Sequence, residues 1–219
     1  LKKLSLKVFP GEIVGILGPN GCGKTTLFSM CIGEQQIEGG RILLNNKQID
    51  QVPIQLRANE GLGYLPQQRS VFNMSVFHNV LGVCELSIKG VDEQKAVAEK
   101  ILDRFNLQHL RSVNANYLSG GELRRLMMAR VMINNPKVVL LDEPFAALDP
   151  LIIEEISKYI LSIQANKTSI IVSDHNIKNL FAIVDRAYVL GSQGVIAEGT
   201  PSELLKSSKA IESYFGSNF

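Results

Sequence analysis

The sequence predicts an α/β fold built on a mostly parallel sheet with helices on both of its faces. Three observations lead to this fold class: short apolar runs rich in β-branched residues, amphipathic helical stretches between them, and a glycine-rich turn after the first run. Buried strands that alternate with helices are typical of parallel sheets, because each crossover helix covers a face of the sheet. The strand-like runs span residues 11–17, 41–44, 61–65, 137–141, 169–173, 187–190 and 195–196.

Helices are expected between these strands. The first follows the glycine-rich turn at about 25–32, and another covers 95–105. A third lies between the strands at 137–141 and 169–173, because isoleucines recur there at the three- and four-residue spacing of a helix. A last helix begins after Thr200, where Thr200-Pro201-Ser202-Glu203 has the form of a capping box with proline in the first turn.

The middle of the chain is predicted to be a separate helical lobe. Its pattern is helical from about 71 to 134, whereas strand-like runs dominate both flanks. We therefore divide a single domain, residues 1–219, into a discontinuous core (1–67 and 136–219) and a helical lobe (68–135).

Composition excludes several classes of protein. The 219 residues carry 23 Lys and Arg against 21 Asp and Glu, a net charge of +2, which argues against a dedicated nucleic-acid surface. Apolar runs are only a few residues long, whereas a membrane-spanning helix needs about 20. Three scattered cysteines fit a reducing compartment. The opening residues lack the features of a signal peptide, and we expect the native N-terminus to lie upstream of Leu1.

A phosphate-binding loop follows the first predicted strand. The pattern G-x-x-x-x-G-K-[ST] is formed by Gly18, Pro19, Asn20, Gly21, Cys22, Gly23, Lys24 and Thr25. Its backbone N–H groups and the positive end of the next helix suit phosphate oxygens. Lys24 would reach the β- and γ-phosphates, Thr25 would bind Mg²⁺, and Thr26 could donate near the α-phosphate. The alternative is a chance glycine-rich turn.

Two carboxylates end the strand at 137–141. Ligands of parallel sheets bind at the carboxyl ends of the strands, where Asp142 is placed to hold Mg²⁺. Glu143 is placed to orient or deprotonate an attacking water. The alternative is a strand that simply ends in solvated acids.

A third motif opens a predicted helix. Ser119 and Glu122 form a capping box, which needs no further function. The box does not explain Gly120 and Gly121, which weaken the first turn of the helix. Bare backbone amides at a helix start suit a phosphate, so we predict phosphate contact here.

Other polar residues lie close to strand or helix ends. Gln67 and His175 each follow a strand, and a lone histidine is more often structural. Asp149 precedes Pro150 as an ordinary helix cap. We interpret His78 and His109 as structural.

Together these features resemble the ATP-binding-cassette (ABC) ATPases. The resemblance covers essentially the whole chain and implies a P-loop NTPase (RecA-like) core with an antiparallel β edge and an inserted α-helical lobe. The family's motifs occur here in the family's order: Walker A (18–25), Q-loop (Gln67), signature (118–122), Walker B (138–143), D-loop (146–149) and H-loop (His175).

The resemblance also implies an assembly and a set of roles. ATP and Mg²⁺ would be bound by a head-to-tail homodimer, each ATP lying between Walker A of one subunit and residues 119–122 of the other. Glu143, His175, Lys24 and Gln67 would be catalytic. His175 would hold the γ-phosphate and the attacking water, and Gln67 would sense Mg²⁺, which Thr25 and Asp142 also bind. Asp149 would link the two sites.

Within that family, the chain is most similar to the ATPases of lipopolysaccharide transporters. The supporting segments are 61–67, 142–146, 173–176 and 186–201. The resemblance implies a subunit on the cytoplasmic face of the inner membrane, where it docks under two integral-membrane permeases. Lipopolysaccharide would be the cargo of the complex and not a ligand of this chain. We expect part of the docking groove at Phe72, Val76, Phe77, Val80 and Cys84, unless these side chains form the lobe's core.

Other functions remain open at this point. An importer ATPase for branched-chain amino acids would share the cassette, although Asn176 after His175 argues against it. A soluble cassette ATPase is a second alternative. A small-molecule phosphotransferase would leave the 118–122 motif and His175 unexplained.

The chain departs from the family's pattern at a few positions. Ala147-Leu148 replaces the glycine-valine common in this subfamily, and Cys22 stands where small residues are usual. The family stacks adenine on an aromatic residue upstream of the first strand. Residues 1–9 offer no good candidate, because Phe9 is too close to that strand, so we expect the stacking residue further upstream.

Overall fold

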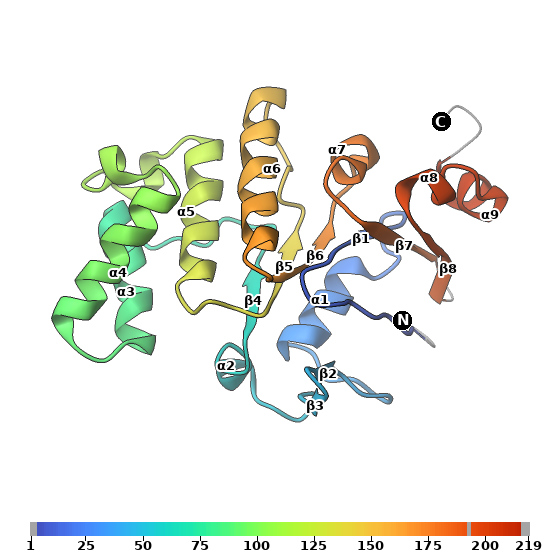
Figure 1. Cartoon of the computed structure of the whole chain (residues 1–219), viewed down its shortest axis with the longest axis horizontal. Coiled ribbons are helices and arrows are strands. Elements are labelled where there is room, and N and C mark those ends of the chain that lie inside the picture. The colour runs from blue at the N-terminus through green and yellow to red at the C-terminus, as the bar shows by residue number, and fades with distance from the viewer. Residues whose placement is uncertain (1–3, 192–193, 216–219) are drawn as a thin grey trace.

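A six-stranded sheet forms the centre of the molecule. In the computed structural model, which describes residues 4–191 and 194–215, the strands pair in the order β4-β5-β6-β1-β7-β8 (Figure 1). They are β1 (Ile13–Leu17), β4 (Leu62–Leu65), β5 (Val138–Asp142), β6 (Ser169–Ser173), β7 (Arg186–Gly191) and β8 (Gly194–Gly199). All neighbours are parallel except β7 and β8, which are antiparallel. The predicted α/β fold with an antiparallel edge is therefore confirmed.

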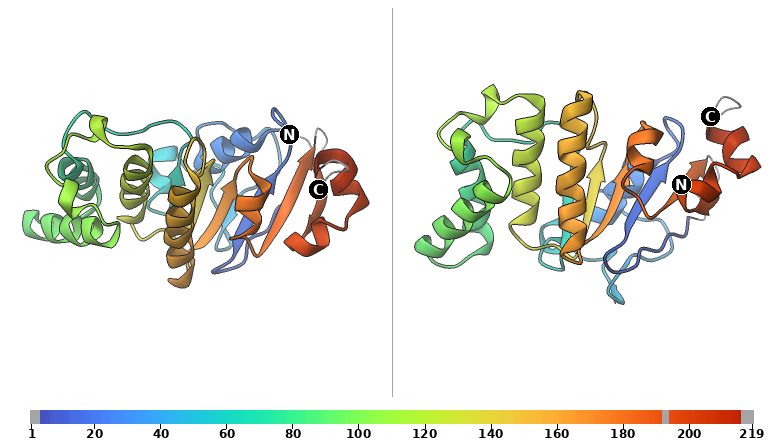
Figure 2. Two further views of the ribbon diagram at one scale, coloured as in Figure 1. Left: turned by 90° about the horizontal axis from the view of Figure 1, so that it is seen from above. Right: turned by 45° about the horizontal axis from the view of Figure 1, so that its top comes forward.

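Helices cover both faces of this sheet (Figures 1 and 2). Alternate residues of β1 point to opposite faces: Val14 and Ile16 pack with Phe28 of α1, whereas Ile13 and Leu17 belong to the core that includes α6 and α7. The helices are α1 (Lys24–Ile32), α2 (Ile54–Arg57), α3 (Val76–Ser87), α4 (Val91–Arg104), α5 (Gly120–Met132), α6 (Pro150–Ala165), α7 (Ile177–Phe181), α8 (Pro201–Leu204) and α9 (Ser208–Ala210), with short helical turns η1 (Gln108–Leu110), η2 (Ala115–Tyr117) and η3 (Ile211–Phe215).

One predicted strand lies outside the central sheet. Residues 41–44 contribute only β2 (Leu43–Leu44), which pairs with β3 (Lys47–Gln48) as a separate hairpin. Asn45 and Asn46 form its turn with φ values of 50° and 64°. Two consecutive positive φ values suit a tight hairpin turn, and asparagine tolerates them well.

The helices α3, α4 and α5 gather at one end of the molecule, beyond the β4 edge of the sheet (Figure 1). Their buried side chains continue the core of the sheet without a break, from Leu65 and Leu141 through Met127 to Leu102. No helix among the described residues is long and apolar enough to cross a membrane.

Candidate nucleotide site

The loop after β1 is shaped by its glycines. Gly18 lies so close to β7 that an added Cβ would be 2.6 Å from the Leu190 carbonyl oxygen. Gly21 and Gly23 have φ values of 79° and 105°, which favour glycine. Gly23 also occupies the N-cap of α1 and offers no side chain to cap it. The first amides of α1 are therefore available to a phosphate.

Lys24 folds back over this loop. Its Nζ donates to the carbonyl oxygens of Gly18 at 2.6 Å and Pro19 at 3.2 Å, and the residue is buried. The loop thus holds a cation at its mouth. Thr25 is exposed beside it at the start of α1, whereas Cys22 and Thr26 are half-buried.

Asp142 ends β5 in a buried position. Its Oδ1 accepts from the Ser173 hydroxyl at 2.6 Å, while Oδ2 is buried and has no hydrogen-bond partner among the residues that the structure describes. Burial and the nearby charge of Asp142 raise the pKa of Tyr64 to about 12. A buried carboxylate oxygen without a partner is costly unless a cation or donor reaches it. The donor chemistry here therefore fits Mg²⁺, which prefers oxygen ligands.

Two predicted residues contact the carboxylate of a third, Glu143. Gln67 Nε2 donates to Glu143 Oε2 at 2.5 Å, and His175 Nε2 contacts Oε1. Glu143 itself has a φ of 49°, a left-handed conformation that strand residues avoid, and its N–H donates to the Ser173 carbonyl at 2.9 Å. This backbone turn ends the strand geometry of β5, and the Glu143 carboxylate lies between Gln67 and His175.

The phosphate loop and these carboxylates occupy the same edge of the sheet. Ile16 of β1 and Asp142 of β5 both lie in register with Ser173 of β6. Because the strands are parallel, the loops that follow all three leave from one edge. The structure therefore brings the phosphate loop, Asp142, Glu143 and His175 to one site.

Two residues of this site were missed by the sequence analysis. Asp174 is buried and accepts from the N–H groups of Phe145 and Asn176, so it ties the loop after Glu143 to the loop of His175. Arg124 of α5 is also buried; desolvation lowers the pKa of its guanidinium, and the nearby carboxylates of Asp174 and Glu143 oppose that shift. The position of Asp174 after a strand was a usable signal, whereas Arg124 gave none.

The 119–122 motif forms the predicted capping box. The N–H of Glu122 donates to Ser119 Oγ at 3.4 Å, and Ser119 N donates to Glu122 Oε2 at 2.8 Å. Hydrogen bonds from the Ser119 hydroxyl and backbone lower the pKa of Glu122. The glycines also have a packing role that the sequence did not reveal: a Cβ at Gly121 would lie 2.7 Å from Ile152 Cγ2 of α6.

The 119–122 motif does not reach the phosphate loop of its own chain. Three strand spacings separate β4 from β1, about 14 Å at the usual ~4.8 Å each. Figure 1 shows α5, which packs against β4, on the far side of α6 from α1. The two motifs of a single chain therefore cannot both contact the same phosphate.

Asp149 begins α6 but does not cap it with its side chain. It has the extended backbone of an N-cap residue, yet no side-chain cap hydrogen bond forms, so the predicted capping by its carboxylate is wrong. Its carboxylate remains exposed to solvent. Ala147, two residues earlier, has a φ of 57°.

The predicted docking residues mostly form the lobe's core. Val76, Val80 and Cys84 are fully buried, because they lie on the face of α3 that packs inward, and that part of the prediction is wrong. Phe77 is partly buried, whereas Phe72 is 54% exposed.

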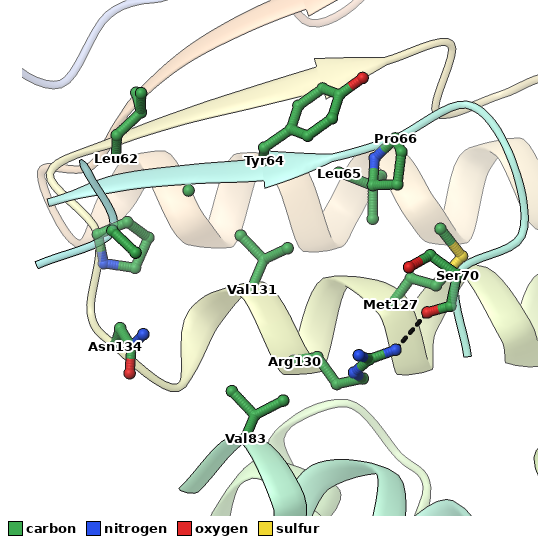
Figure 3. Close-up of a pocket in the computed structure, with 13 residues that line it drawn as sticks. Leu62, Tyr64, Leu65, Pro66, Ser70, Val83, Met127, Arg130, Val131 and Asn134 are labelled. Atoms are coloured by element: carbon green, nitrogen blue, oxygen red, sulfur yellow. Dashed lines mark hydrogen bonds between the residues drawn. The ribbon is translucent and has the colours of Figure 1, made fainter. Parts of the chain in front are cut away.

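A cavity of about 210 Å³ opens between β4, α3 and α5, close to Phe72 (Figure 3). Arg130 lines it; its Nη1 donates to the Ser70 carbonyl, and its guanidinium lies 4.9 Å from the centre of the Phe72 ring. Buried Asn79 holds the segment 72–74, which precedes α3. Its side chain accepts from Phe72 N at 2.8 Å and donates to the Met74 carbonyl at 3.1 Å.

Comparison with known proteins identifies similar chains. A family model described as ABC transporter matches residues 1–146. The chain is 38% identical to the lipopolysaccharide export system ATP-binding protein LptB of Escherichia coli, across 100% of this chain and 92% of that protein. It is 40% identical to LptB of Acidithiobacillus ferridurans, across 100% and 91%. The solved structure of cbiO1 from Clostridium perfringens, part of the ABC transporter complex cbiONQ, matches with a TM-score of 0.84 at 31% identity, covering 94% of this chain and 84% of that one.

Proposed function

This chain belongs to the ABC transporter family, and we propose that it is the ATP-hydrolysing subunit of a lipopolysaccharide exporter. The observation that carries the proposal is the site itself: Glu143 lies between Gln67 and His175, at the sheet edge that also holds the phosphate loop. Two relatives similar to this chain over its full length bear the name of the export system's ATP-binding protein, which supports lipopolysaccharide as the cargo.

Each residue of the site has a separate role in phosphoryl transfer. Lys24 would leave the carbonyls of the loop and turn to the β- and γ-phosphates. Glu143 would take a proton from the attacking water once Gln67 and His175 exchange their present contacts for water and phosphate. Thr25, Gln67 and Asp142 would hold Mg²⁺, which when bound would supply positive charge beside the phosphates. Positioning and electrostatics then suffice, and no covalent intermediate is needed.

The working unit is a head-to-tail homodimer. Each ATP would lie between the phosphate loop of one copy and residues 119–122 of the other, with Asp149 linking the two sites. The separation of these motifs within one chain supports this arrangement. The γ-phosphate then bridges the copies, and its hydrolysis opens the dimer.

The helical lobe would transmit this motion to two membrane permeases. We divide the chain at 67/68 and 135/136, and place the docking surface at Phe72 and the cavity lined by Arg130. An exposed aromatic beside a cavity is a suitable anchor for a partner helix. The subunit would thus sit on the cytoplasmic face of the inner membrane, without binding lipopolysaccharide itself.

Purification from native membranes tests the cargo. The tagged full-length protein is isolated in mild detergent, and its companions are identified by mass spectrometry. We expect two permeases and bound lipopolysaccharide. Amino-acid permeases, or no membrane protein at all, would contradict the export function. A Phe72→Ala variant should lose the permeases, whereas Leu86→Ala, an 88% exposed side chain elsewhere on α3, should keep them.

A further inference from the structure

A cluster of polar side chains joins the segment after Gln67 to the segment before the 119–122 motif. Four residues form this cluster, which we call the loop bridge: Arg69, Asn73, Asn114 and Asn116. Arg69 Nη2 donates to the Ala115 carbonyl at 2.6 Å. Asn73 Oδ1 accepts from the side-chain amides of the other two asparagines at 3.0 and 2.9 Å. Two loops that belong to different motifs are therefore hydrogen-bonded to each other.

We propose that the loop bridge couples the position of Gln67 to that of the 119–122 motif in the same chain, which makes Arg69 a positioning residue for hydrolysis. The inference rests on the proposed head-to-tail dimer. There, Gln67 serves the ATP on the phosphate loop of its own copy, whereas the 119–122 motif serves the ATP of the other copy. A link between them inside one chain is therefore a link between the two ATP sites of the dimer.

The chain between the bridge and each motif is short. Arg69 follows Gln67 by two residues, and Asn116 precedes the N-cap residue of α5 by three. Fully extended chain spans at most about 3.6 Å per residue, so these stretches reach at most about 7 Å and 11 Å. The backbone is also braced, because Ala115 N donates to the Met74 carbonyl at 3.0 Å. A shift at one end is therefore passed to the other and is not absorbed by slack chain.

The coupled path is anchored at both ends. At one end, Gln67 Nε2 donates to Glu143 Oε2 at 2.5 Å. At the other end, the first turn of α5 packs against α6, where Gly121 faces Ile152. Contacts thus continue from the carboxylate that would activate water, through Gln67 and the loop bridge, to the backbone that would meet the ATP of the second copy. Coupling between sites can be carried by such continuous networks of hydrogen-bonded and packed groups.

The loop bridge lies at the surface, so its loss should spare the fold. Arg69 is exposed to solvent, as are two of the three asparagines. Substitutions of such surface residues usually change stability little. The loop also keeps a separate attachment to α5, because Arg130 Nη1 donates to the Ser70 carbonyl (Figure 3). Removal of the Arg69 side chain therefore breaks the contact closest to the 119–122 motif and leaves the rest of the loop attached.

A thermodynamic cycle on dimer formation tests the coupling. In a Glu143→Gln background, which slows hydrolysis, the dissociation constant of the dimer with ATP and Mg²⁺ is measured for the parent, Gln67→Ala, Arg69→Ala and the double variant. We expect Gln67→Ala to weaken the dimer about threefold less per site when it is combined with Arg69→Ala, because a side-chain hydrogen bond carries the link. Arg41→Ala is the matched control: Arg41 is an exposed arginine beside the β2–β3 hairpin, and its effect should simply add to that of Gln67→Ala.

Additive effects of Gln67→Ala and Arg69→Ala would overturn the inference. Equal coupling of Gln67→Ala to Arg41→Ala would overturn it as well. If Glu143→Gln alone forms no ATP-dependent dimer, the proposed function fails instead.

Hydrolysis provides a second measurement and a rescue. In the otherwise unchanged chain, Arg69→Ala should lower kcat about threefold or more, while the Kd of ATP for the dilute monomer stays the same, because the loop bridge is not part of the phosphate loop. Arg69→Lys should restore most of kcat, since an ammonium group can also donate to the Ala115 carbonyl. Equal kcat values for Arg69→Ala and Arg41→Ala, or no recovery with Arg69→Lys, would contradict the inference.

Discussion

At the scale of single residues, the loop between β5 and α6 combines strain with chemistry. Glu143 and Ala147 both have left-handed backbone conformations, with φ values of 49° and 57°. Such conformations cost free energy in residues other than glycine and are concentrated at functional sites. The sequence predicted the roles of Asp142 and Glu143 from the strand before them. It did not reveal that Arg124 is buried near the charge of Glu143, because a charged residue inside an amphipathic helix carries no signal of burial.

Ala147 offers a test of this strain. Because glycine adopts a left-handed conformation without a steric penalty, Ala147→Gly should raise the free energy of unfolding by about 0.5–1 kcal/mol. Ala146→Gly, which changes an ordinary backbone position, should lower it by a similar amount. Urea denaturation of both variants measures the difference. Equal destabilisation by the two glycines would show that Ala147 is not strained.

Substitution of Asp142 should change the stability of the chain and its ATP hydrolysis in opposite directions. Its Oδ2 is buried without a partner, so Asp142→Asn should stabilise the nucleotide-free chain by about 1–3 kcal/mol while ATP hydrolysis is lost. Unfolding in the absence of Mg²⁺ and phosphate release in its presence measure the two effects. Ser173→Ala should instead destabilise the chain, because it removes the only donor to Oδ1 that the described residues provide. A less stable Asn variant would contradict this account of Asp142.

At the scale of elements, α5 and α6 explain more of the 119–122 motif than the sequence suggested. The sequence predicted the capping box, and the structure confirms it. The sequence also left Gly120 and Gly121 without a structural reason. That reason comes from tertiary packing: Gly120 faces Leu148, Gly121 faces Ile152, and Arg125 of α5 pairs with Glu155 of α6. No local pattern encodes such a close approach of two helices.

Gly121 makes this packing testable. A Cβ there would lie 2.7 Å from Ile152 Cγ2, so Gly121→Ala should destabilise the chain by about 1–3 kcal/mol. In an Ile152→Ala background the same substitution should cost much less, because the opposing methyl group is gone. Thermal or urea unfolding of the unchanged chain, the two single variants and the double variant completes this double-mutant cycle. An unchanged cost in the double variant would place the effect elsewhere.

At the scale of the whole molecule, the order of the strands determines what one copy can do. The sequence predicted buried strands and helices, yet it did not predict that β1 lies between β6 and β7. That order depends on long-range pairing. It puts the phosphate loop and the 119–122 motif at separate places, joined by one continuous core. The docking prediction failed at Val76, Val80 and Cys84 for a related reason: apolar residues at helical spacing mark a buried face, and α3 buries that face in its own lobe.

ATP is expected to join two copies of this chain. Glu143→Gln should slow hydrolysis while preserving the shape of the site. The oligomeric size of this variant is therefore measured with ATP and Mg²⁺ and, as a control, with ADP and Mg²⁺. We expect a dimer with ATP and a monomer with ADP, because only the γ-phosphate bridges the copies. Only monomer with ATP, despite measurable ATP binding, would contradict it.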